Sequence, residues 1–299
     1  MDRLKTMEIF IQVAQMLSFS RAAEVLQLPR SSVSNAIQSL EAHLQTRLLH
    51  RTTRKIQLTA DGEMYYDWCR RLLADIEDTE QRLRVGSSSP RGRLRVSVPS
   101  RLASHLIAPQ VHHFLQLYPD LELEVSSTDR PVDLIPEGID CAIRVGNLHD
   151  ENLVVRHLGV LPQGTYASPA YIEQFGLPTS IDALEAHQSI HYLSPASGRL
   201  LELDFVVDGE LVRVKMSGRL AVNSVESYIA CCCAGLGLIQ IPRFDAAELV
   251  RQGQLTEVLP ELAPESMPIA AVYPDRRYVS RRVRVFIAWM QQLVQKGCC

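Results

Sequence analysis

The sequence lacks the motifs that mark the common enzyme classes. It contains no Gly-x-Ser-x-Gly elbow, no Gly-Lys phosphate loop and no His-Glu-x-x-His metal helix. It also has no apolar run long enough to cross a membrane, and no signal peptide stands at its start. We therefore expect a soluble, cytoplasmic protein that is not an enzyme, uses no cofactor and does not contact a membrane.

Disulfide and zinc frameworks are missing as well, although the chain has seven cysteines. No two of them form a Cys-x-x-Cys pair, which indicates a reduced protein without a structural metal site. His187 and His191 have the interval of metal ligands on a helix, but no third ligand accompanies them. We expect the run Cys231–Cys233 to pack as small apolar side chains in a helix over 224–234. The alternative is a redox-sensing role for this run, which would require a thiolate of low pKa.

Positive charge is concentrated near the start of the chain. The whole sequence has 31 Lys and Arg against 34 Asp and Glu, whereas residues 1–60 hold eight basic against four acidic side chains. A basic segment on an acidic body favours a polyanionic partner such as nucleic acid. A basic cluster taken alone is more often a solvated surface, so the neighbouring pattern has to decide.

Residues 20–44 have the pattern of two short helices joined by a tight turn, the helix-turn-helix that places its second helix in the DNA major groove. Apolar residues of the second helix recur at intervals of four, three and four, at Val33, Ile37, Leu40 and Leu44. Pro29 suits a first-turn position, so this helix is predicted to begin between Pro29 and Ser31.

The face opposite the apolar stripe carries polar side chains that can read base edges. The residues of this helix that we expect to contact DNA are Arg30, Ser31, Ser32, Ser34, Asn35 and Gln38. An ordinary amphipathic helix with a solvated face is the alternative.

Residues 47–59 alternate apolar with polar or cationic side chains over a length that suits a small β-hairpin. Such a hairpin would form a wing beside the second helix. Its cations could neutralise phosphates or enter a narrow minor groove, where the negative potential is strongest. The wing residues that we expect at DNA are Arg51, Thr52, Arg54 and Lys55.

The segment from Phe10 to Gly62 resembles the winged helix-turn-helix of LysR-type transcriptional regulators. The matching positions are Phe10, Ala14, Ser18, Phe19, Ser20, Ala22, Ala23, Val33, Ser34, Ile37, Leu40, Glu41, Leu44, Arg51 and the run Leu58–Gly62. The sequence departs from the family at Pro29-Arg30-Ser31, where a Gln is common, and at Gln45, where Gly is usual. The missing Gln bears on base preference and not on the fold.

A long helix is predicted from a cap at Thr59 to about Val85, with an apolar seam in a heptad pattern. The seam residues expected to pair two copies of the chain are Tyr65, Cys69, Leu72, Ile76 and Leu83, with Thr79 at the same spacing. The resemblance supports this, because the family uses the segment as a dimerising linker. A helix packed on its own domain is the alternative. Residues 86–90 then break the helix and form a hinge.

From Arg93 onward strands and helices alternate, which is typical of an α/β fold with mainly parallel sheets. About 200 residues exceed one compact unit, so two lobes are expected. The resemblance implies the family's effector-binding domain, which is similar to periplasmic binding proteins. The expected organisation is a DNA-binding domain at 1–60, a linker helix and hinge at 61–90, and an effector domain at 91–299. Its first lobe would take 91–162 and 267–299, and its second lobe 163–266.

A ligand of such a domain would lie between the lobes, at the carboxyl ends of strands and the amino ends of helices, where backbone amides favour an anion. Hydroxyl, amide and guanidinium groups gather at the predicted strand ends. The residues that we expect at an effector are Ser100, Arg101, Ser126, Ser127, Thr128, Arg144, Tyr192, Ser194, Asn223 and Ser224. For each residue taken alone, the alternative is a polar side chain whose hydrogen bonds are made locally, in a loop or at a cap.

The resemblance implies a transcriptional regulator that responds to a small, anionic effector. The expected partners are double-stranded DNA with an interrupted inverted repeat, the effector, and further copies of the chain as a dimer or tetramer. RNA polymerase is a further candidate partner. A thiol-based redox regulator, and a ligand carrier or enzyme with an accessory DNA-binding head, are the rival interpretations.

Overall fold

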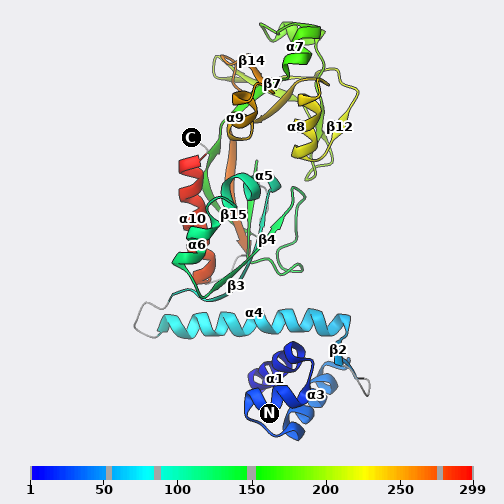
Figure 1. The fold of residues 1–299 in the computed structure, drawn as a ribbon, viewed down its shortest axis with the longest axis vertical. Helices are drawn as coiled ribbons and strands as arrows, with labels where there is room; N and C mark the ends of the chain where they lie inside the picture. The colour runs from blue at the N-terminus through cyan, green and yellow to red at the C-terminus, as the bar shows by residue number, and fades with distance from the viewer. Residues whose placement is uncertain (1, 52–55, 84–88, 147–152, 275–278, 298–299) are drawn as a thin grey trace. The chain divides into compact units, whose positions relative to one another are not determined.

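The computed structural model describes residues 2–51, 56–83, 89–146, 153–274 and 279–297 (Figure 1). The chain divides into two compact units, Met1–Ser89 and Pro90–Cys299, and each is described by itself. Within the described ranges, no helix combines the length and the apolar character needed to span a bilayer.

Unit 1 consists of helices and one small hairpin. Its elements are α1 (Arg3–Met16), α2 (Phe19–Leu26), α3 (Arg30–Leu44), β1 (Leu49–Arg51), β2 (Ile56–Leu58) and α4 (Ala60–Leu83). Asp2 caps α1 by accepting from the amide of Leu4, and Ser18 caps α2 by accepting from the amide of Arg21. The predicted start of the second helix is confirmed, since α3 begins at Arg30.

The core of unit 1 forms where the apolar faces of α1, α2 and α3 meet. Val33 and Ile37 of α3 are fully buried, Leu40 is nearly so, and Leu44 packs on the edge of the same cluster. Ala22 of α2 is also fully buried, and its small side chain allows α2 and α3 to approach closely. The apolar stripe therefore does what its spacing predicted, leaving the other face of α3 to solvent.

Helix α4 packs on the same core with part of the seam that was assigned to a partner. Cys69 is fully buried in the cluster, and Tyr65 and Leu72 lie against it. Cys69 therefore packs on its own domain, as the alternative had it, whereas for the partly buried Tyr65 and Leu72 the expected pairing between copies stays a prediction. Thr59 caps α4 as predicted, because its hydroxyl accepts from the amide of Gly62 at 2.9 Å.

Unit 2 begins with a five-stranded sheet in the order β4-β3-β5-β15-β6. These strands are β3 (Gly92–Val98), β4 (Leu121–Ser127), β5 (Cys141–Val145), β6 (Leu153–Leu161) and β15 (Met267–Pro274). The helical elements are α5 (Ser100–Leu102), a π-helical turn (Ala103–Ile107), α6 (Val111–Leu117) and α10 (Arg281–Gly297). Helices α6 and α10 lie along one side of the sheet (Figure 1), where Phe114 packs on Trp289 with ring centroids 4.6 Å apart. This sheet and its helices form the first lobe.

The second lobe contains three smaller sheets, β13-β7-β14, β12-β8-β9 and the hairpin β10-β11. Its strands are β7 (Gln163–Ala167), β8 (His191–Leu193), β9 (Leu200–Leu201), β10 (Leu203–Val207), β11 (Glu210–Val214), β12 (Ala221–Val222), β13 (Ile239–Pro242) and β14 (Thr256–Val258). Its helices are α7 (Pro169–Phe175), a 3-10 turn (Asp182–Ala186), α8 (Val225–Cys233) and α9 (Arg243–Arg251). The chain passes from the first lobe to the second between β6 and β7, and returns between β14 and β15.

The expectation of mainly parallel sheets is wrong. Strand β3 is parallel to β4 and β5, but β15 is antiparallel to both β5 and β6, and β7 is antiparallel to β13 and β14. The returning segment enters the first sheet after the second lobe is complete, so β15 runs against its neighbours. Strand and helix alternation alone does not reveal this reversal.

Gly62→Ala tests the junction between the wing and α4. A Cβ on Gly62 would lie 2.0 Å from the carbonyl oxygen of Leu48, so the backbone would have to shift. We expect a loss of about 1–3 kcal/mol and a thermal midpoint several degrees lower, measured by circular dichroism on the full chain. The neighbouring exposed Glu63→Ala is the control, and equal midpoints for the two variants would contradict this packing.

Candidate DNA-reading face and ligand cavity

The polar face of α3 lies on the surface of unit 1. Arg30, Ser31, Asn35 and Gln38 are exposed, whereas Ser32 and Ser34 are half-buried. This row consists of short hydroxyl and amide side chains on a helix whose opposite side is fully packed. Such a face can reach base edges without disturbing the core.

The wing predicted from the alternation in 47–59 is present as an antiparallel hairpin, with Leu49 opposite Leu58 and Arg51 opposite Ile56. Glu41 of α3 holds the hairpin, because its Oε1 accepts from the amides of Leu48 at 2.9 Å and Leu49 at 3.1 Å. The side chain of Arg51 and the whole of Thr52, Arg54 and Lys55 lie outside the described residues. Their contact with phosphates stays a prediction.

A cavity of about 660 Å³ lies in unit 2 between the two lobes. The first lobe contributes residues from α5, β5, β6 and β15, and the second lobe contributes residues from β8, β10, β13, α8 and α9. Most lining side chains are apolar, including Leu102, Val132, Val145, Leu161, Leu203, Tyr228, Ile241 and Phe244. A concave, largely apolar space with a few polar groups is the usual form of a small-molecule site.

Half of the predicted effector residues line this cavity. They are Arg101, Thr128, Arg144, Tyr192 and Ser194. The other predicted residues are not among the lining side chains: Ser100, Ser126, Ser127, Asn223 and Ser224. Ser100 contributes through its backbone, since its amide donates to Oδ1 of Asp129 at 3.0 Å, and Ser224 is the N-cap of α8. The strand-end rule therefore located the cavity, but several of its polar residues serve local structure.

Arg101 is engaged by carboxylates of the second lobe. Its Nε donates to Asp245 at 2.8 Å, and its Nη1 donates to both oxygens of Glu226 at 3.1 and 3.2 Å. Burial alone would lower the pKa of Arg101, but these two carboxylates more than offset it and raise the pKa. The guanidinium expected to bind a ligand acid is thus already paired, and it joins α5 to α8 and α9.

Arg144 is the cation of the cavity that has no carboxylate partner among the described side chains. Its Nη1 donates to the carbonyl of Ile143 at 3.0 Å and to Ser97 at 3.4 Å, while its buried Nη2 has no hydrogen-bond partner. Burial lowers the pKa of Arg144. Because an arginine stays charged in proteins, this side chain presents to the cavity a positive charge that Glu137, beyond ion-pair distance, offsets only in part.

Sequence reasoning missed Glu226, Asp245 and Gln163. Asp245 and Gln163 are buried, both line the cavity, and each follows or begins a strand of the second lobe. The strand-end rule that pointed to Arg144 would have included Asp245, which comes shortly after β13. No local signal marks the pairing of Asp245 with Arg101, because the two are 144 residues apart in sequence.

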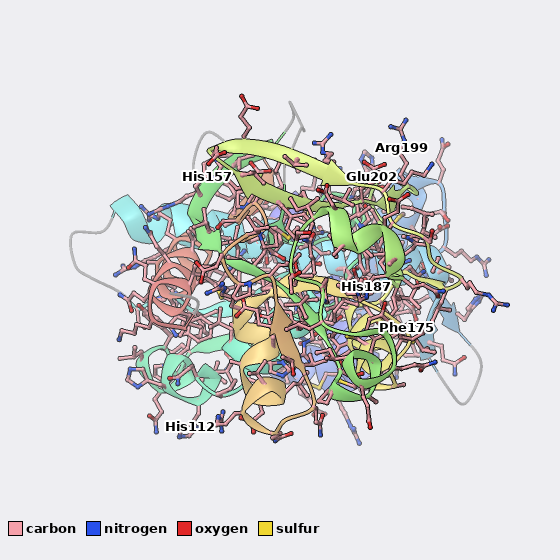
Figure 2. All side chains as sticks on the ribbon, turned by 90° about the horizontal axis from the view of Figure 1, so that it is seen from above. His112, His157, Phe175, His187, Arg199 and Glu202 are labelled. Atoms are coloured by element: carbon pink, nitrogen blue, oxygen red, sulfur yellow. The ribbon has the colours of Figure 1, made fainter. Side chains whose placement is uncertain are left out.

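The cysteine run and the histidine pair serve the packing of the second lobe. Cys232 is fully buried and donates to the carbonyl of Tyr166 at 3.6 Å, and burial raises its pKa. His187 and Phe175, both labelled in Figure 2, pack on Tyr171, whose hydroxyl lies 3.2 Å from Nδ1 of His187. A raised thiol pKa disfavours the thiolate that redox sensing requires.

The sequence matches two family profiles and several known proteins. The profile described as bacterial regulatory helix-turn-helix protein, lysR family, covers residues 4–63, and LysR substrate binding domain covers residues 87–295. The chain is 40% identical over 296 residues to YhjC of Escherichia coli K12, described as an uncharacterized HTH-type transcriptional regulator, with 99% of both chains covered. It is 38% identical over 293 residues to an HTH-type transcriptional repressor of Pseudomonas aeruginosa, with 98% of this chain and 92% of that one covered.

Among solved structures it is similar to CrgA, a LysR-type transcriptional regulator from Neisseria meningitidis. The TM-score is 0.60 at 31% identity, with 96% of this chain and 97% of that chain covered. These matches extend over both units. They agree with the predicted fold class, a helix-turn-helix region followed by a two-lobed α/β domain.

Glu41→Ala tests whether this carboxylate holds the wing. The change leaves the amides of Leu48 and Leu49 without their acceptor, and each loss costs about 1–3 kcal/mol in a partly buried setting. We expect the thermal midpoint of unit 1 to fall by several degrees, measured by scanning calorimetry. Glu41→Gln keeps an acceptor oxygen and should lose far less, so equal losses for both variants would show that the contact does not support the wing.

Proposed function

The chain belongs to the LysR family of bacterial helix-turn-helix regulators, and we propose that it controls transcription by coupling a small ligand in unit 2 to the way unit 1 holds DNA. Proteins of this family are transcriptional regulators. The observation that carries the proposal is that one chain holds both an exposed polar face on α3 and a cavity of about 660 Å³ between two lobes.

In this proposal the two parts of the winged head have different tasks. Ser31, Ser34, Asn35 and Gln38 read base edges from α3, because their amide and hydroxyl groups can match donors and acceptors in the major groove. The wing cations, at Arg51, Arg54 and Lys55, neutralise phosphates and so set the affinity and its salt dependence. The polar exposed face of α3 supports the first assignment.

Self-association places two winged heads on an interrupted inverted repeat. Since Cys69 packs inside unit 1 and Tyr65 and Leu72 lie against the same core, we assign the partner contact to the outer side of α4. Two large apolar side chains are exposed there, Met64 at 68% and Trp68 at 42%. Isolated exposed apolar residues are common, but two on successive turns of a helix favour a contact. A dimer of such dimers would form the tetramer.

The ligand acts by changing which arrangement of the lobes is stable. If the lobes have two arrangements, a ligand shifts the equilibrium between them only to the extent that it binds one more tightly than the other. The contact of Arg101 with Asp245 and Glu226 spans the lobes beside the cavity, so a ligand there would strengthen or compete with an existing link. We infer that the response passes through this link, and that the ligand is a small anion because Arg144 has no ion-pair partner among the described carboxylates.

The rival functions have less support. A thiol-based redox regulator needs a reactive thiolate, whereas Cys232 is buried with a raised pKa and Cys233 has a raised pKa as well. An enzyme needs a nucleophile or base at the cavity, whereas the lining carboxylates Asp129, Asp204 and Asp245 already accept from backbone amides or from Arg101. We further propose that the protein works in the cytoplasm, where bacterial DNA is found, and that RNA polymerase is a partner at the regulated promoters.

Asn35→Ala tests the assignment of base reading to α3. Fragments selected from genomic DNA by the full-length protein supply the target site, and affinity is then measured on that site and on shuffled DNA. We expect the preference for the site to fall by about 1–3 kcal/mol while non-specific binding stays the same. Gln15→Ala, which removes an exposed amide side chain from α1, is the control. An equal loss on both DNAs, or no selected site at all, would overturn the proposed role.

Trp68→Glu tests the partner contact on α4. A carboxylate in an apolar interface is strongly unfavourable, so we expect the mass in sedimentation velocity at micromolar protein to fall by about half. Val250→Glu is a matched control, because Val250 of α9 is exposed to 41%. Circular dichroism checks that the variant is folded. An unchanged mass for folded Trp68→Glu would remove α4 from the proposed interface.

A further inference from the structure

Three carboxylates that line the cavity have hydrogen-bond donors, whereas one of its two cations has no carboxylate partner among the described residues. Asp245 is paired with Arg101, Oδ1 of Asp129 accepts from the amide of Ser100 at 3.0 Å, and Oδ1 of Asp204 accepts from the amide of Glu265 at 3.0 Å. Arg144 alone among the lining cations has no carboxylate within ion-pair distance in the part of the chain that the structure describes. The protein therefore provides one site for one negative charge.

A second buried donor in the lining also lacks an acceptor. The side chain of Gln163 is 5% exposed, and its Nε2 has no hydrogen-bond partner. Gln163 is the first residue of β7, directly after the chain crosses from the first lobe to the second. A buried donor without an acceptor costs about 1–3 kcal/mol, and because Gln163 lines the cavity, a rotation of its side chain would bring this donor to a ligand oxygen.

The remaining surface of the cavity is apolar on both sides. The first lobe supplies Leu102, Val132, Leu134, Val145, Leu153, Val155, Leu161, Met267 and Val272, and the second lobe supplies Leu201, Leu203, Val225, Ile241 and Phe244. The hydration of apolar side chains is unfavourable, so a ligand that displaces water from this surface should carry an apolar body. A small polar anion such as phosphate would leave most of the volume unmatched.

A second negative charge on the ligand would meet carboxylates. Asp204 lies half-buried in the lining, where burial raises its pKa, and Glu202 and Glu265 line the same side. Glu202 is exposed and is labelled in Figure 2. These groups belong to the second lobe, whereas Arg144 belongs to the first. A dicarboxylate that spans the cavity would therefore pair at one end and be repelled at the other.

We propose that the ligand of this cavity is an amphipathic monocarboxylate, with its carboxylate on Arg144 and its apolar body between the lobes, and that dicarboxylates of the same length are rejected. This inference rests on the proposed function, in which the cavity is the effector site. The inference adds the number of negative charges on the ligand and its chemical class.

A matched series of probes tests the charge count on the full-length protein. Octanoate and 4-phenylbutanoate are the monocarboxylates, suberate is the eight-carbon dicarboxylate, and octanamide is the uncharged analogue. Isothermal titration calorimetry should give binding of at least one monocarboxylate in the millimolar range or tighter. Suberate and octanamide should bind about tenfold or more weakly, since a hydrogen bond to a charged group contributes about 1.5–3 kcal/mol.

Arg144→Met tests the residue assignment, because it removes the charge and keeps most of the length. We expect octanoate to bind about tenfold more weakly and the preference for octanoate over octanamide to disappear, which a general loss of packing would not produce. Arg156→Met is the control. Arg156 is exposed on β6 and donates to Gln291 at 3.5 Å, away from the cavity. The probe series on the unmodified protein decides the proposal even if Arg144→Met does not fold.

Equal or tighter binding of suberate or octanamide would overturn the proposal, as would the absence of binding by both monocarboxylates. The same preparation is used to select genomic DNA fragments, which separates two kinds of failure. Enriched fragments without monocarboxylate binding would reject this ligand class but would not contradict the proposed function as a transcriptional regulator. Neither enrichment nor binding by a folded protein would reject the proposed function as well.

Discussion

The ion pair between Arg101 and Asp245 ties the two lobes of unit 2 to each other beside the cavity. It joins α5 of the first lobe to α9 of the second at 2.8 Å, and the Asp245 side chain is only 3% exposed. Removing one partner of such a buried pair lowers the stability of the fold, because the other charge is then buried without a counter-charge. Both partners line the cavity between the lobes. In the proposed function, a ligand there would neutralise the charge of Arg144.

In unit 1 a single carboxylate joins two elements, as the ion pair does in unit 2. Glu41 extends from α3 and accepts two amides of the wing, so the recognition helix and the hairpin are fixed to each other. Thr59 then ties the wing to the start of α4 through its hydroxyl. A rigid head matters for a regulator that reads DNA, since a change in the spacing of two heads is transmitted to the duplex only if each head moves as one body.

The sequence predicted the elements whose signals are local. The spacing of Val33, Ile37 and Leu40 gave the recognition helix and its buried side, and strand-end placement led to Arg144. It did not show that Cys69 packs in the core of unit 1, because a heptad pattern says which side chains are apolar and not which surface they meet. It also could not supply the partner of Arg101 or the orphaned amide of Gln163. Those follow from contacts between segments far apart in the chain, which periodicity does not record.

Under the proposed function, occupancy of the cavity in unit 2 is coupled to DNA binding by unit 1. The most direct measurement is the affinity of a cavity ligand for the full-length protein, determined by calorimetry with and without its selected DNA site. Coupling is reciprocal, so we expect saturating DNA to change the ligand affinity by a factor of about 5–150. Identical affinities with and without DNA would contradict the coupling, because a ligand that does not distinguish the DNA-bound from the free protein cannot regulate.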